Sequence, residues 1–259
     1  DYIGKRQSID LKIKKTGENN FLVSEKNNIE LPYSVGLLKN DSIVYSKIYS
    51  KTGKIELPEV DFDYIAVNPS IKLPEFNRNN NWIYNKSSSN LKPLKFKFIG
   101  DLENPKYRNI FYRPEVTYNL YDGISPGVNL INRGIKNRPL SFEIFTQYAS
   151  KEEALVGSMN FRYQLNNEIK DNYSTLFNLF YTTNHYNENL RYQVFSPSIL
   201  INFRDNKNLR SNIKRSISLS MFNVDKENNT LDKNSLNKYS IYNLGYYYSD
   251  IGIIKYLNT

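Results

Sequence analysis

Residues 155–165 read Leu-Val-Gly-Ser-Met-Asn-Phe-Arg-Tyr-Gln-Leu, and apolar and polar side chains alternate along most of this stretch. Successive side chains of a β-strand point to opposite faces. One face would carry Leu155, Met159, Phe161, Tyr163 and Leu165, and the other Ser158, Asn160, Arg162 and Gln164. The stretch therefore predicts a strand with one apolar side and one polar side.

The same two-residue period recurs on both sides of this stretch, in residues 140–148 and 216–221. Asp122-Gly123 follows another alternating run and supplies the positive backbone angles that a tight hairpin turn needs. The chain is thus expected to run up and down as antiparallel strands. The apolar phase changes between Val194 and Ile199, which predicts a bulge or bend around Ser196-Pro197-Ser198.

Two architectures can use such strands. The apolar faces meet each other in a soluble sandwich, whereas they face lipid in an outer-membrane barrel whose polar faces line the interior. Several segments run for about 9 to 11 residues, the length of a tilted strand that crosses a bilayer, whereas ordinary strands have about 5 to 6. Tyrosines stand at segment ends, as in the aromatic girdles of membrane barrels. Strand length and tyrosine placement favour the barrel.

The barrel interpretation assigns side chains to each face. The predicted lipid-facing residues are Leu140, Phe142, Ile144, Leu155, Met159, Phe161, Ile217 and Leu219. The predicted lumen-facing residues are Glu143, Asn160, Arg162 and Gln164. A network between Glu143 and Arg162 is expected inside the barrel, with a structural or gating role.

We predict an all-β chain in two parts. Residues 1–76 carry short strands and suggest a partial immunoglobulin-like sandwich. Residues 77–91 are rich in Asn and Ser and suggest a linker, and residues 92–259 suggest an antiparallel up-and-down outer-membrane β-barrel of about nine or ten strands. Because Asp1 is not an initiator methionine and the last residues lack a terminal aromatic, we expect a piece of a longer chain with a truncated barrel.

Composition excludes several classes of function. The chain has no cysteine, which excludes disulfides and thiolate chemistry. The net charge is +9, but Lys and Arg are spread along the chain without a recognition motif, so nucleic acid is not an expected partner. No apolar run reaches the roughly 18 residues of a membrane-spanning helix, and any membrane contact must come from strands.

The search for catalytic chemistry assigns no residue. The one histidine, His185, is expected in an exposed loop, without the second His of a zinc helix or the Ser of a catalytic triad. Glu152-Glu153 fits a charged turn better than an acid–base pair. The oxygen-rich residues 73–82 could be a Ca²⁺ loop, but their spacing fits a linker better. We assign no catalytic residue, no metal ligand and no cofactor to this chain.

Several short motifs resemble one family. They are residues 57–58, 61–69 and 73–80 (the last reading Leu-Pro-Glu-Phe-Asn-Arg-Asn-Asn), then Lys92-Pro93-Leu94-Lys95-Phe96, Tyr112-Arg113-Pro114, residues 118–123 (Tyr-Asn-Leu-Tyr-Asp-Gly) and residues 155–158. Together they resemble the end of the peptidase portion and the carboxyl-terminal outer-membrane barrel extension of Bacteroidota zinc aminopeptidases of the aminopeptidase N (gluzincin) family. The resemblance extends to about Leu165 and thins afterwards.

The resemblance implies a function for the whole parent protein. The family's His-Glu-x-x-His helix is absent from this sequence, so a catalytic zinc domain would precede Asp1. The first hypothesis is a noncatalytic anchor that holds an upstream peptidase domain of the same chain at the bacterial outer membrane, with outer-membrane lipid as its partner. The alternatives are an outer-membrane transport or assembly barrel and a soluble all-β glycan-binding module.

Overall fold

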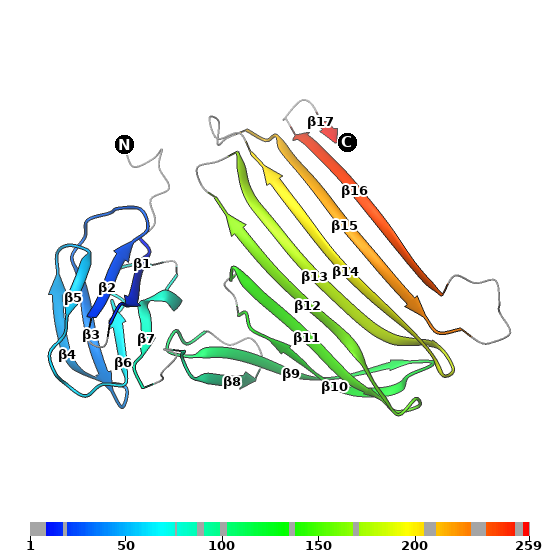
Figure 1. Cartoon of the computed structure of the whole chain (residues 1–259), viewed down its shortest axis with the longest axis horizontal. Coiled ribbons are helices and arrows are strands. Elements are labelled where there is room, and N and C mark those ends of the chain that lie inside the picture. The colour runs from blue at the N-terminus through cyan, green and yellow to red at the C-terminus, as the bar shows by residue number, and fades with distance from the viewer. Residues whose placement is uncertain are drawn as a thin grey trace. The chain divides into compact units, whose positions relative to one another are not determined.

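The computed structural model of the chain describes residues 9–17, 20–75, 77–86, 91–98, 103–134, 138–167, 171–204, 211–228, 237–251 and 256–258 (Figure 1). Their regular structure is β-strand apart from one short 3-10 helix, as predicted for an all-β chain, and they divide into two compact units. Unit 1 comprises Asp1–Lys95 and Glu103–Asn109, and unit 2 comprises Phe96–Leu102 and Ile110–Thr259. Within the described residues, no helix is long and apolar enough to cross a membrane.

Unit 1 contains two antiparallel sheets of short strands. One sheet has the order β1-β2-β5 and the other β4-β3-β6-β7. The bounds are β1 (Leu11–Lys15), β2 (Asn20–Glu25), β3 (Tyr33–Lys39), β4 (Ser42–Tyr49), β5 (Gly53–Glu56), β6 (Tyr64–Val67) and β7 (Trp82–Tyr84), with a short 3-10 helix, η1 (Asn79–Asn81). The immunoglobulin-like description of this unit stays a prediction.

The two sheets of unit 1 enclose an apolar core. On β1, Leu11 and Ile13 are buried while Lys12 and Lys14 are exposed, which is the alternation of a half-buried strand. Phe21 and Val23 on β2 meet side chains from the other sheet in the same cluster, among them Val35, Leu37, Ile65 and Val67. The β3–β4 hairpin turns at Asn40 and Asp41, whose positive φ angles of 48° and 65° suit a two-residue turn.

Residues predicted to form a linker contribute to unit 1. Trp82 is the first residue of β7, which pairs with β6. The side chain of Trp82 is buried against Tyr64. Glu75 is buried too: its Oε2 accepts a hydrogen bond from the backbone N–H of Leu11 at 3.0 Å, and its Oε1 accepts from the side-chain amides of Asn68 and Asn81, both at 2.8 Å. The carboxylate of Glu75 therefore ties residues 73–82 to the sandwich, and its oxygens are occupied by N–H donors.

Unit 2 is one sheet of ten strands in strictly sequential order, from β8 at one edge to β17 at the other. The strands are β8 (Leu94–Phe98), β9 (Arg108–Asn119), β10 (Gly123–Ile131), β11 (Leu140–Ala149), β12 (Ala154–Asn166), β13 (Asn172–Asn187), β14 (Leu190–Phe203), β15 (Lys214–Lys226), β16 (Lys238–Ile251) and β17 (Tyr256–Asn258). Each pair of neighbouring strands from β9 to β17 is antiparallel, which confirms the predicted up-and-down order.

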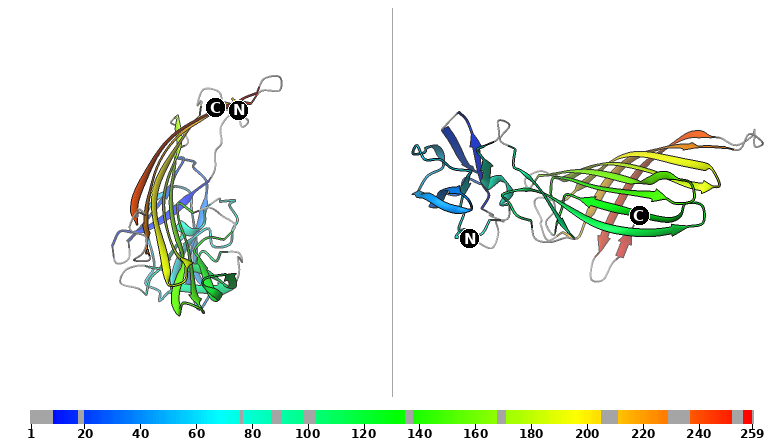
Figure 2. Two further views of the ribbon diagram at one scale, coloured as in Figure 1. Left: turned by 90° about the vertical axis from the view of Figure 1, so that its right-hand side faces the viewer. Right: turned by 90° about the horizontal axis from the view of Figure 1, so that it is seen from below.

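The long strands of unit 2 bow in one direction (Figure 2). From β9 to β16 they contain 9 to 16 residues, well above the usual length of about 5 to 6. The predicted turn at Asp122-Gly123 is confirmed, with Gly123 at φ +71° between β9 and β10. The described sheet remains open, with β8 and β17 as its edges.

The predicted bulge around Ser196-Pro197-Ser198 is absent from the described pairing. The pairing of β14 with β13 continues in one register through Phe195, Ser196 and Pro197. Tyr192 and Val194 instead lie on the polar face of the sheet, which explains the apparent change of phase. The register shifts of β13 fall elsewhere, between Asn172 and Ser174 and between His185 and Asn187.

Replacing Glu75 by Gln tests its role in unit 1. The amide keeps one oxygen for the two Asn donors but turns its N–H groups toward the N–H of Leu11. We expect the free energy of unfolding of unit 1 to fall by about 1 to 3 kcal/mol, measured by urea titration. The single tryptophan, Trp82, is buried in unit 1, so its fluorescence follows this unit alone. Glu59→Gln, at an exposed position, is the control, and equal stability of the two variants would contradict this role.

Unit 1 should lose stability at alkaline pH through Tyr33. Burial, with a smaller contribution from Tyr49, raises the pKa of Tyr33 from 10 to about 12. The fold thus favours the neutral phenol, which donates a hydrogen bond to the carbonyl of Lys51 at 3.0 Å. This contribution is complete below pH 10 and is lost as the pH rises from 10 to 12. Trp82 fluorescence in urea at several pH values measures it, and Tyr33→Phe should reduce this dependence, the remainder coming from Tyr64 and Tyr49, whose pKa values are also raised by burial.

Candidate functional site

The main candidate site is the apolar face of unit 2, where side chains from neighbouring strands form continuous rows. The register places six directly paired residues across β11 to β16, in the order Leu140, Tyr163, Phe177, Ile199, Leu219 and Leu244. A second row contains Phe142, Phe161, Leu179 and Pro197. All of these residues share one face because facing residues of paired strands point to the same side.

The opposite face carries a matching polar row. In the same strands it contains Ser141, Arg162, Asn178, Ser198, Ser220 and Asn243. Apolar side chains occur on this face too, among them Leu176 and Phe180, which pair with Gln164 and Asn160. The face is therefore mixed but mainly polar.

Burial in unit 2 is inverted relative to a soluble protein. The apolar face is exposed, with Leu140 at 57%, Leu219 at 51% and Leu244 at 79%. On the other face, Asn129, Ser141 and Gln147 are only 4 to 6% exposed. Among the unit 2 residues whose exposure is described, the only buried hydrophobic side chains are Phe111, Ala149 and Val156. Unit 2 therefore lacks an apolar core in its described part.

The predicted residues of each face lie where the alternation placed them. Leu140, Phe142, Ile144, Leu155, Met159, Phe161, Ile217 and Leu219 share the apolar face, and Glu143, Asn160, Arg162 and Gln164 share the polar face. The prediction of a network that joins Glu143 to Arg162 is wrong. Glu143 accepts a hydrogen bond from the amide of Asn129 at 2.8 Å, and in the described part of the chain no bond joins it to Arg162.

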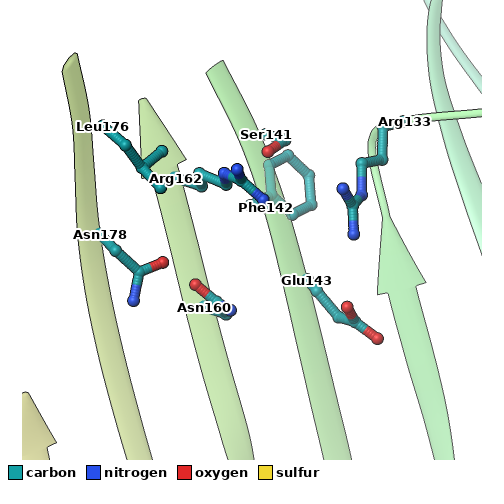
Figure 3. A pocket seen from close by; sticks show the side chains of 8 residues that line it. All are labelled: Arg133, Ser141, Phe142, Glu143, Asn160, Arg162, Leu176 and Asn178. Carbon is teal, nitrogen blue, oxygen red and sulfur yellow. The ribbon is translucent and has the colours of Figure 1, made fainter. Parts of the chain in front are cut away.

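A small hollow lies on the polar face (Figure 3). It measures about 100 Å³. Its lining consists of Arg133, Ser141, Phe142, Glu143, Asn160, Arg162, Leu176 and Asn178. Three of the four predicted lumen residues therefore surround it. Sequence reasoning missed Arg133, which follows β10 outside any alternating segment.

His185 is not in an exposed loop, as the sequence suggested, but in β13 and 7% exposed. Its Nδ1 lies 2.6 Å from Oδ1 of Asp122, a residue of the β9–β10 turn that is 2% exposed. In the sheet, β11 and β12 separate β13 from β10, so this contact requires the sheet to curl. Asp122 also accepts a hydrogen bond from the side-chain amide of Asn119.

The His185–Asp122 pair belongs to a rim formed by three hairpin turns, residues 120–122, 150–153 and 188–189. The backbone N–H of Lys151 donates to the carbonyl of Asp122 at 3.1 Å, and its Nζ donates to the carbonyl of Leu120 at 3.0 Å. The backbone N–H of Asn189 donates to the carboxylate of Glu152 at 3.1 Å. Glu152 thus joins neighbouring turns, consistent with its expected place in a charged turn.

The geometry offers no metal centre in the described part of the chain, where no three His, Cys, Asp or Glu side chains lie close enough to hold an ion. The suggested Ca²⁺ loop fails for a further reason: the Glu75 carboxylate accepts three N–H donors. Within the described residues, no hydroxyl or thiol group is hydrogen-bonded to His185 or to the carboxylate of Asp122.

Comparison of the chain with protein-family models, with curated proteins and with solved structures finds no match. The two faces of unit 2 are therefore the features of the molecule that bear on its function.

Removing His185 tests the rim. His185→Ala removes one of the two side-chain partners of the buried Asp122 carboxylate and leaves only the amide of Asn119, and the loss of a hydrogen bond to a charged group costs about 1.5 to 3 kcal/mol. We expect this loss in the free energy of unfolding of unit 2, followed by far-UV circular dichroism in detergent micelles. Asn187→Ala, at an exposed position two residues away, should change stability by less than about 0.5 kcal/mol. A His185→Ala variant as stable as this control would refute a structural role for the pair.

Proposed function

We propose that unit 2 is the membrane-embedded part of an outer-membrane β-barrel and that it acts as a noncatalytic anchor. The observation that carries this proposal is the inverted burial: apolar rows are exposed on one face, while polar side chains are sheltered on the other. This is the arrangement of a transmembrane barrel, whose lipid-facing side is apolar and whose interior is polar.

The free energy of burying apolar side chains supports lipid as the surroundings of the apolar face. Full burial of a Leu, Ile or Phe side chain is worth about 1.5 to 3 kcal/mol. For on the order of ten such side chains, each about half exposed, transfer from water to lipid would contribute roughly 10 kcal/mol. The apolar face also extends well beyond the scattered apolar side chains that are normal on soluble monomers.

Strand length fits the same proposal. Leu155 to Leu165 on β12 spans ten steps of about 3.4 Å, or roughly 34 Å. At a tilt of about 40° this gives an apolar height near 25 Å, the height of the lipid-facing band of such barrels.

If unit 2 lies in a bilayer, the edges of its sheet must be paired. Backbone N–H and C=O groups must be paired inside a bilayer. β17 pairs with residues 249–251 of β16, which leaves residues 238–248 of that strand without a partner on this side in the described structure. In a membrane this edge must therefore join another strand, either from β9 of the same sheet or from outside the described residues.

The identity of the anchored protein rests on the sequence resemblance. Under this proposal the parent is an outer-membrane zinc aminopeptidase of the aminopeptidase N (gluzincin) family, with zinc in a domain upstream of Asp1. The chain alone should then have no peptidase activity. Measurable hydrolysis of aminoacyl substrates by the purified chain would contradict the anchor function.

Arginine substitutions on the two faces test membrane insertion. Leu219→Arg puts a charge on the apolar face, which costs about 2 to 4 kcal/mol at the middle of a bilayer. Ser220→Arg puts the same charge on the polar face, opposite Ser198 and Asn243. We expect Leu219→Arg to reduce folding into phospholipid vesicles, measured by flotation and by circular dichroism in urea, and Ser220→Arg to leave it nearly unchanged.

A soluble module gives a different result. In that case Leu219→Arg would replace an exposed side chain in water and change stability by less than about 0.5 kcal/mol, and the wild-type chain would stay monomeric in buffer without detergent. Vesicle insertion accompanied by ion conductance would favour the transport alternative over the anchor.

A further inference from the structure

We propose that the hollow on the polar face of unit 2 binds the oxyanion of a small solute, a carboxylate or a phosphate group, through Arg133 and Arg162. The site goes beyond the anchor function, because lipid contact uses only the opposite face. Three neighbouring strands, β11 to β13, and Arg133 after the end of β10 build it.

The register brings the donors together. Arg162 on β12 lies directly opposite Ser141 on β11 and opposite Asn178 on β13. Arg133 enters from the other side, just after the end of β10. Figure 3 shows Arg162 extending toward Ser141 and Phe142 from one side, whereas the guanidinium group of Arg133 lies on the other side of Phe142, above Glu143. The two guanidinium groups therefore lie on either side of the β11 residues that line the hollow.

Among the described residues, neither the guanidinium group of Arg133 nor that of Arg162 takes part in a hydrogen bond or an ion pair. The one acidic residue of the lining, Glu143, points away from Arg162 and accepts from Asn129 at 2.8 Å (Figure 3). Nothing in the described lining thus neutralises both positive charges, and an anion would supply the missing acceptors.

The chemistry of the lining selects an oxyanion. A guanidinium group presents parallel N–H donors that match the two oxygens of a carboxylate or phosphate. The side-chain amide of Asn178 and the hydroxyl of Ser141 can add neutral donors. The oxygen Oδ1 of Asn160 is buried without a hydrogen-bond partner in the described structure, so it can accept from a protonated phosphate oxygen or from another donor of the solute.

Size and position favour a small solute over a lipid headgroup. The hollow of about 100 Å³ has room for one oxyanion or a few water molecules. Six lining residues lie on the polar face and Arg133 follows β10, whereas Phe142 alone belongs to the apolar rows, so a lipid whose chains contact those rows does not present its headgroup there.

The test uses the full chain in detergent micelles, titrated calorimetrically with sodium phosphate and, in a separate arm, with sodium acetate at constant ionic strength. We expect saturable one-to-one binding of at least one of them. Arg162→Gln should weaken it about tenfold or more, since a hydrogen bond to a charged group is worth about 1.5 to 3 kcal/mol. Arg133→Gln should weaken it similarly.

The matched control is Arg215→Gln. It removes the same charge from the other face of the sheet, where Arg215 pairs with Phe203 and Tyr248. Affinity for the anion should be unchanged in this variant. Absence of saturable binding of both anions to the wild-type chain would overturn the inference, as would equal weakening by Arg215→Gln and Arg162→Gln. Binding in micelles does not depend on vesicle insertion, so this result and the membrane test can fail separately.

Discussion

The register between neighbouring long strands is the constraint on which unit 2 depends. From β11 to β16 the pairing aligns the apolar rows on one face of the sheet and the polar row on the other, although a few pairs such as Asn160 with Phe180 are mixed. A slip by one residue would move every side chain of a strand to the other face. Both the apolar rows and the hollow exist only because this register is kept over six strands.

The two units differ in which side chains they bury. Unit 1 buries apolar side chains between two short-stranded sheets, and one buried carboxylate, that of Glu75, organises its polar interior. Unit 2 has long strands, shelters its polar side chains and exposes its apolar ones. Hydrophobic burial in water can stabilise unit 1 by itself, whereas the apolar face of unit 2 requires a second apolar phase or a covering partner.

Local alternation was sufficient to predict strands, hairpin turns and faces, because side-chain direction in a strand depends only on position parity. It placed all eight apolar and all four polar residues on their faces. It failed for properties that depend on contacts distant in sequence. The loop assigned to His185 is part of β13, whose pairing partner extends the strand, and Tyr192 and Val194 are apolar residues on a polar face. Arg133 joins the hollow only because β10 and β12 flank the same strand.

The contact between His185 and Asp122 also bears on how the sheet forms. The two residues are 63 positions apart in sequence, whereas each hairpin of unit 2 joins neighbouring segments. Closing a long loop costs more entropy than zipping a hairpin, so this bond is expected to form after β10 to β13 have paired. The rim would then form late in folding and only in a correctly paired sheet. A sheet with a misaligned strand could not bring the imidazole of His185 and the carboxylate of Asp122 together, and it would not reach its full curvature.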